Sequence, residues 1–170
     1  GVDEYIVLKE DGSISECSGF EIVTRPDCPS VHKRIWSNAL LVPEVRQHMS
    51  SWTNGKCGIH IHVSRRPLSD LWVGRMLVLI NADKMQPLVH AIAGRSSSSY
   101  TKYIKKNLTD ATPDNRSGDR YEALNTSGDH TIEFRIFRGT LEPAGFMKNI
   151  EFVEAVLAYC KPASRSLRDI

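Results

Sequence analysis

Histidine, glutamate and arginine alternate with apolar residues in two short stretches of the chain. After Gly58, His60 and His62 alternate with isoleucine and valine, and further on Glu133 and Arg135 alternate with isoleucine and phenylalanine. Alternation with a period of two predicts a β-strand that is apolar on one face and polar on the other. Two such strands side by side would display two imidazoles, a carboxylate and a guanidinium on one surface.

A further carboxylate, Glu21, lies in the alternating stretch from Gly19 to Arg25 and shares a face with Arg25. If this stretch joins the same sheet, one concave surface holds two carboxylates, two imidazoles and two guanidinium groups. Carboxylate and imidazole are ligands for Mg²⁺ or Mn²⁺, and guanidinium groups neutralise the charge of a transferring phosphate. Taken singly, each residue is also explained as an exposed histidine or as part of a surface ion-pair ladder.

The remaining sequence indicates the elements that position these residues. Alternation predicts strands over 5–10, 19–25, 57–64 and 131–137. Helical spacing predicts helices over 30–49 with a break at Pro43, over 69–90 with a cap at Ser69 and a kink at Pro87, and over 144–160. Turns are expected at Asp11-Gly12 and Asn54-Gly55, and a mobile loop over 107–119. The expected fold class is α+β, with helices on one face of the sheet.

Length and composition indicate one ordinary domain, expected over residues 1–160 with a tail over 161–170. The chain has 170 residues, of which 41% are hydrophobic and 25% charged. A net charge of +2 argues against bulk attraction to nucleic acid, and runs such as Met76–Ile80 are far shorter than the roughly 20 residues of a membrane span. With no signal-peptide pattern and no Cys-x-x-Cys pair, we expect reduced cysteines, no membrane and a cytoplasmic protein.

Two other segments are weaker candidates. The stretch 94–100 contains Arg95 and four serines and could hold a phosphate, although a flexible serine loop explains it equally well. Arg120 and Asn125 flank a short apolar run and indicate little by themselves. Two alternatives stay open: a hydrolase with a metal at the two strand histidines, and a nucleic-acid-binding protein that uses the basic clusters at 65–66 and 102–106.

Read in order, these segments resemble the amidoligase family of the carboxylate–amine ligase superfamily, which has the glutamine synthetase and glutamate–cysteine ligase fold. The resemblance spans roughly residues 5–159. The matching segments are Asp11-Gly-Ser13, Gly19-Phe-Glu-Ile-Val-Thr-Arg-Pro26, Cys57-Gly-Ile-His-Ile-His-Val-Ser64, Gly94-Arg-Ser with Tyr100, Arg120-Tyr-Glu-Ala-Leu-Asn125 and Thr131-Ile-Glu-Phe-Arg-Ile-Phe-Arg-Gly-Thr-Leu141.

The resemblance implies a curved, mostly antiparallel sheet whose concave face binds ATP and Mg²⁺ or Mn²⁺. It also implies that a small-molecule or peptide carboxylate is phosphorylated to an acyl phosphate, from which an amine displaces phosphate to form an amide. The implied metal ligands are Glu21, His60 and Glu133. The implied nucleotide and phosphate partners are His62, Arg95, Arg120, Asn125 and Arg135, with Arg135, Arg95 and Arg120 as the catalytic residues.

The chain departs from the family pattern at its start. Family members begin with a Gly-x-Glu-x-Glu strand ahead of the Asp-Gly-Ser turn, whereas Gly1–Tyr5 has only a faint likeness to it. We therefore expect either an N-terminally shortened piece or a protein that has lost this strand, with weaker metal binding. A sheet edge left open in this way could pair with a second copy or another partner chain. The alternative function is a non-catalytic descendant of the fold that acts as a binding or inhibitory protein.

Overall fold

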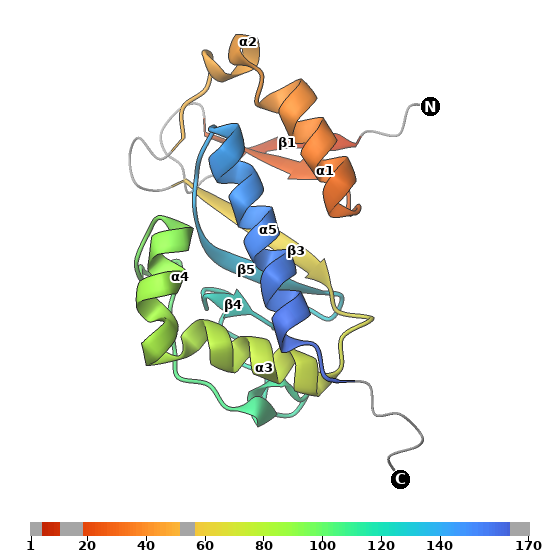
Figure 1. Ribbon diagram of the computed structural model, residues 1–170, viewed down its shortest axis with the longest axis vertical. Coiled ribbons are helices and arrows are strands. Elements are labelled where there is room, and N and C mark those ends of the chain that lie inside the picture. The colour runs from red at the N-terminus through yellow and green to blue at the C-terminus, as the bar shows by residue number, and fades with distance from the viewer. Residues whose placement is uncertain (1–4, 11–18, 52–56, 164–170) are drawn as a thin grey trace. The chain divides into compact units, whose positions relative to one another are not determined.

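The computed structural model describes residues 5–10, 19–51 and 57–163 (Figure 1). They divide into two compact units, one formed by residues up to 58 together with 139–147, the other by 59–138 and the residues from 148 onward. Both units combine helices with antiparallel strands, which confirms the α+β class; the single domain over 1–160 stays a prediction. The two predicted turns at 11–12 and 54–55, and residues 164–170 of the predicted tail, lie outside the described residues.

The first unit contains a β-hairpin. Strand β1 (Ile6–Glu10) pairs antiparallel with β2 (Phe20–Thr24), and the register places Lys9 opposite Glu21. Both strands fall where the sequence predicts them. Glu21 is exposed, as are Lys9 and Phe20. In this unit the strands therefore leave their polar and several of their apolar side chains in contact with solvent.

The helix predicted over 30–49 is broken into three pieces. These are α1 (Pro29–Ile35), a π-helical turn (Trp36–Leu40) and α2 (Pro43–Arg46). Proline has no backbone N–H and clashes with the preceding turn, so a helix cannot continue through it but can begin at it. Pro43 accordingly begins α2, and the break at this residue is confirmed.

The second unit contains a three-stranded sheet in the order β3–β5–β4. Its strands are β3 (Gly58–Ser64), β4 (Leu124–Asn125) and β5 (Thr131–Arg138). The N–H of Arg65 donates to the carbonyl of His130, so the end of β3 lies beside the beginning of β5 and the two strands run antiparallel. The short strand β4 is absent from the sequence prediction, since two residues are too few for a visible alternation.

Two helices stand where the sequence predicts one helix over 69–90. Helix α3 (Asp70–Asn81) is followed by a 3₁₀ turn (Asp83–Met85) and by α4 (Gln86–Ala93). The prediction of a single helix is therefore wrong. Pro87 lies in the first turn of α4, where a backbone N–H has no helical partner to lose, so it starts a helix instead of kinking one.

The last helix and the cap of α3 agree with the sequence. Helix α5 (Pro143–Cys160) covers the predicted 144–160 segment. At the start of α3 the Oγ of Ser69 accepts the N–H of Trp72 at 3.3 Å. The indole of Trp72 in turn donates to the carbonyl of Leu157 at 2.9 Å, which fastens α3 to α5.

The core of the second unit lies between these helices and the apolar face of β5 (Figure 1). Its buried members include Ile132, Phe134 and Ile136 from β5, Val73, Met76, Leu77 and Ile80 from α3, Val89 and Ala93 from α4, and Val153, Val156 and Cys160 from α5. Glu133 and Arg135, on the opposite face of β5, are buried too, at 8% and 6% exposed. The helices therefore cover the apolar face of β5, while Glu133 and Arg135 face the other way.

Part of the segment 107–119, predicted as a mobile loop, has regular structure. A 3₁₀ helix (Leu108–Ala111) begins at Asn107, whose side chain and that of Asp110 form a reciprocal capping box. The segment packs against α3 so closely that a Cβ atom at Gly74 would collide with the carbonyl of Leu108. Among the described residues, no helix is both long and apolar enough to cross a membrane.

Candidate functional site

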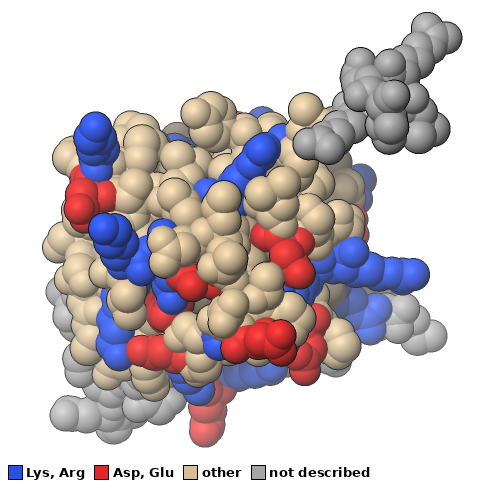
Figure 2. All heavy atoms as spheres, turned by 90° about the horizontal axis from the view of Figure 1, so that it is seen from below, with Lys and Arg blue, Asp and Glu red and all other residues tan. Residues whose placement is uncertain are grey.

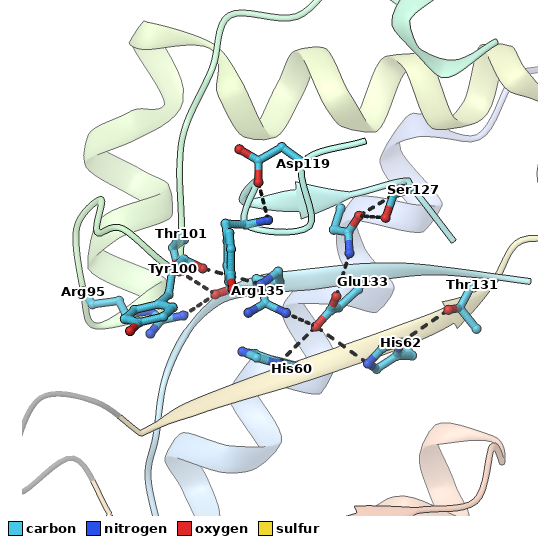
Figure 3. Close-up of polar contacts among 12 residues, drawn as sticks. His60, His62, Arg95, Tyr100, Thr101, Asp119, Ser127, Thr131, Glu133 and Arg135 are labelled. Carbon is cyan, nitrogen blue, oxygen red and sulfur yellow. Dashed lines mark hydrogen bonds and ion pairs between the residues drawn. The ribbon is translucent and has the colours of Figure 1, made fainter. Parts of the chain in front are cut away.

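Glu133 is the centre of a polar cluster on the face of β5 that lies opposite the helices (Figure 3). Its Oε1 accepts from Nη1 of Arg135 at 2.6 Å and lies 3.0 Å from Nδ1 of His60. Nε2 of His62 is 3.8 Å from the same oxygen. Oε2 accepts from Nδ2 of Asn125 at 2.9 Å. Both carboxylate oxygens therefore have nitrogen partners, and we call these five residues the Glu133 cluster.

Local structure explains why these side chains meet. Alternation on β3 puts both histidines on one face, and pairing of β3 with β5 sets that face beside Glu133. The register of β4 places Asn125 directly opposite Glu133. The N–H and hydroxyl of Ser127 donate to Oδ1 of Asn125 at 2.9 and 2.7 Å, which turns the amide so that its nitrogen faces the carboxylate.

Glu133 is ionised at neutral pH. Burial raises the pKa of this carboxyl, because a charge is costly away from water. The hydrogen bonds from His60 and Asn125, together with the electrostatic influence of His60 and Arg135, lower the pKa by more, and the resulting pKa is about 2. A buried anion of this kind can hold cationic groups in fixed positions.

The guanidinium of Arg135 lies between Glu133 and a pair of tyrosines. Its Nε donates to the carbonyl of Tyr100 at 3.5 Å, and its Cζ is 5.7 Å from the centre of the Tyr121 ring. The two tyrosine rings meet edge to face at 5.7 Å. Arg120 approaches the Tyr121 ring at 5.4 Å. One tyrosine thus has two arginines beside it, and Arg120 is the exposed one.

Arg95, predicted as a phosphate partner, contacts the backbone of β5. Its Nε donates to the carbonyl of Ile136 at 3.1 Å, and its Nη2 donates to the carbonyl of Arg135. The hydroxyl of Thr101 donates to the same Arg135 carbonyl at 3.1 Å. Burial lowers the pKa of Arg95, and the nearby charge of Arg135 lowers it further. In this arrangement Arg95 positions the strand that carries Arg135, and its contact with phosphate stays a prediction.

Glu21 is not part of the three-stranded sheet. Its strand β2 pairs with β1 in the first unit, and within the described residues neither of these strands joins β3 or β5. The condition that the Glu21 strand joins the same sheet as the other two is therefore not met within the described residues. No group of three or more His, Cys, Asp or Glu side chains in the described part of the chain is arranged to hold a metal ion. The ligand role of Glu21 stays a prediction.

The basic cluster at 102–106 is largely neutralised. Nζ of Lys102 lies 2.7 Å from Oδ2 of Asp119, and Nζ of Lys106 lies 2.8 Å from Oε1 of Glu122. Figure 2 shows the same mixture on the face it draws, where basic and acidic side chains lie interspersed. A surface that binds nucleic acid needs a patch of one sign, so these lysines give that alternative little support.

Sequence reasoning missed three residues that support the site, namely Thr101, Tyr121 and Ser127. For Ser127 a signal exists, because Asn-x-Ser is typical of a turn in which the asparagine side chain accepts the N–H two residues on. For Thr101 and Tyr121 the sequence offers none, since their contacts depend on chain segments 34 and 14 residues away.

Comparison with family models, curated proteins and solved structures finds no match for this chain.

Proposed function

We propose that this chain is an ATP-dependent carboxylate–amine ligase domain of the amidoligase type, with a glutamine synthetase-like sheet. The observation that carries the proposal is the Glu133 cluster, in which β3 and β5 bring together both histidines, Glu133 and Arg135. These four residues belong to the two segments that are most specific for the resemblance. Asn125, from a third matching segment, joins them at Glu133.

The proposed reaction has two steps. A carboxylate oxygen of the acid attacks the γ-phosphorus of ATP, and ADP leaves, which gives an acyl phosphate. The amine nitrogen then attacks the acyl carbon, phosphate leaves, and the nitrogen loses a proton to give the amide. Phosphoryl transfer depends on positioning and on neutralising negative charge. Arg135, held by Glu133 and the Tyr100 carbonyl, would supply such charge, and the exposed Arg120 lies near the same Tyr121 ring as Arg135.

The residues present suit a metal that arrives with the nucleotide better than a resident one. The described part of the chain gathers one carboxylate and two imidazoles at Glu133, which is short of a complete ligand set. Mg²⁺ is usually held by one or two carboxylates together with substrate phosphates and water. Glu133 and His60 would hold such an ion. The ion would supply positive charge to the phosphates of ATP.

Calorimetric titration of Mg·ATP into the chain tests the proposal. We expect saturable binding in the micromolar range, equivalent to about −8 kcal/mol. Glu133→Gln keeps the size of the side chain but removes its charge, and should weaken binding at least about tenfold, as the loss of one charged contact does. Glu154→Gln, at an exposed position on α5, is the matched control and should bind as the wild type does. Absence of binding, or equal binding by both variants, would refute the proposal.

One observation favours a second function, a non-catalytic binding protein with the same fold. Both oxygens of Glu133 already have partners in Arg135, His60 and Asn125, so the carboxylate is occupied before any ligand arrives. The discriminating measurement is ADP release in the presence of Mg·ATP, hydroxylamine and a panel of carboxylic acids. Hydroxylamine traps an acyl phosphate as a hydroxamate, so binding without ADP or hydroxamate would favour this second function.

A further inference from the structure

A cavity of about 520 Å³ opens in the second unit at the end of β3 and the start of β5. It is lined by Ser64, Arg65, Arg66, Leu68, Asp129 and His130. None of these residues belongs to the Glu133 cluster. The lining holds two guanidinium groups, an imidazole and a hydroxyl against one carboxylate, and this composition favours an anionic ligand.

The acidic residues around the cavity have cationic partners already. Oδ1 of Asp129 lies 3.5 Å from Nη2 of Arg116, and Oδ1 of Asp70 lies 3.8 Å from Nη2 of Arg65. Arg66 has no ion pair or hydrogen bond with any described residue. Three guanidinium groups therefore face two carboxylates, and the surplus positive charge is that of Arg66.

Arg65 forms a fixed wall of the cavity. Its side chain is 13% exposed, and its Nη2 donates to the carbonyl of Ala111 at 3.0 Å. Its Nη1 donates to the carbonyl of Thr126 at 3.5 Å. A wall held by two separate chain segments preserves the shape of the cavity before a ligand binds, which lowers the entropy lost on binding.

Three hydrogen-bonding side chains line the cavity without a partner among the described residues: Ser64, Arg66 and His130. Ser64 also connects the cavity to the Glu133 cluster. It follows His62 by two residues on the same face of β3, about 7 Å along the strand. Thr131 lies between them on the neighbouring strand, with its Oγ1 3.4 Å from Nδ1 of His62. A polar path thus runs along one sheet face from Glu133 to the cavity.

We propose that this cavity binds a second anionic group, a carboxylate or phosphate, carried by the acid or the amine that the domain joins. The inference rests on the proposed ligase function, because it names the end of the substrate that lies away from the reacting atoms. Arg66 and His130 would donate to the anion, and Ser64 would add a neutral hydrogen bond. The substrate would then carry one reacting group and, at least about 7 Å away from it, an oxyanion.

Titration of the full chain with inorganic phosphate, and separately with succinate, tests this site without nucleotide. The probes are the imidazole NMR signals of the six histidines and the N–H signals of the backbone. We expect the His130 imidazole and the N–H groups of residues 64–66 to shift with one saturable curve. Arg66→Ala should weaken that curve about tenfold, as the loss of one charged hydrogen bond does. Arg75→Ala, which removes an exposed arginine of α3 outside the cavity, should leave it unchanged.

The two titrations identify the anion: saturable shifts with phosphate alone indicate a phosphate group, and saturable shifts with succinate alone indicate a carboxylate group. Shifts at His60 and His62 without shifts at His130 would overturn the inference, as would an Arg66→Ala variant that binds both probes normally. The proposed function can fail separately. If the chain binds phosphate or succinate at Arg66 but does not bind Mg·ATP, the anion site is supported and the ligase function is refuted. If the chain binds Mg·ATP but neither anion, only the anion site is refuted.

Discussion

Glu21 and Glu133 lie on strands of similar pattern, yet the two units give these carboxylates different surroundings. Glu21 is exposed on a two-stranded hairpin opposite Lys9. Glu133 is 8% exposed and is bound by three side chains from three strands, with His62 close by. An exposed carboxylate contributes little to stability, whereas a buried carboxylate depends on each of its partners. The comparison shows that strand pairing and burial, more than residue type, separate a carboxylate built into a site from one on a surface.

The largest expected difference between the two carboxylates is in folding stability. Glu133→Ala leaves the guanidinium of Arg135 buried without its anion, and should lower the free energy of unfolding by about 3–5 kcal/mol. Glu21→Ala removes an exposed side chain and should change it by less than about 0.5 kcal/mol. Urea unfolding followed by fluorescence measures both. Similar losses in the two variants would contradict the distinction between the units.

The pH dependence of stability should come next in size. The pKa of Glu133 is about 2 in the folded chain against an ordinary value of 4.5, so its contribution is complete above pH 4.5 and disappears as the pH falls toward 2. The expected loss is on the order of 3 kcal/mol. Urea unfolding at several pH values checks it. In Glu133→Gln this part of the loss of unfolding free energy at low pH should be absent, whereas Glu21→Gln should keep it. If the free energy of unfolding fell with pH in the same way in the wild type and both variants, this would contradict an ionised Glu133.

Asn125 should show a smaller effect through the same carboxylate. Asn125→Ala removes the donor to Oε2 of Glu133 and frees the Ser127 hydroxyl, and should cost about 1–2 kcal/mol of unfolding free energy. Asn38→Ala, at an exposed position in the first unit, is the comparison and should cost nothing. Thermal unfolding of both variants measures the difference. An equal Tm for Asn125→Ala and the wild type would show that β4 does not fix Glu133.

Helix caps give the smallest difference between the units. Ser69 caps α3 through its hydroxyl, and Ser69→Ala should cost about 1 kcal/mol. Cys28 occupies the same position before α1 and makes no capping bond with its side chain, so Cys28→Ala should leave stability almost unchanged. Circular dichroism during thermal unfolding compares the two. A larger loss at Cys28 than at Ser69 would contradict the assigned caps.

The sequence predicted those elements whose signal is local. Period-two alternation defined β3 and β5, and the hydroxyl before Asp70 defined the start of α3. The break between α3 and α4 escaped prediction because apolar spacing continues across it, so only Pro87 marked it. Strand neighbours are decided by contacts between distant segments, so the sequence left open whether the Glu21 strand joins the sheet of Glu133, and among the described residues it does not.

The site residues, too, were predictable only where their signal is local. His60, His62, Glu133 and Arg135 follow from alternation on two strands, and the structure brings them together. Asn125 was expected at the site from the resemblance only, and β4 provides the physical reason for its place. The backbone contacts of Arg95 could not be foreseen, because they depend on how the 94–101 segment packs against β5.

The most direct test of the central claim is whether Mg·ATP binds at the Glu133 cluster. Imidazole NMR signals provide it, since the six histidines are spread over the chain and only His60 and His62 contact Glu133. The account predicts that Mg·ATP shifts these two signals with one saturable curve and leaves His32, His48 and His90 in place. Saturable binding that leaves the His60 and His62 signals unmoved, or no binding at all, would contradict it.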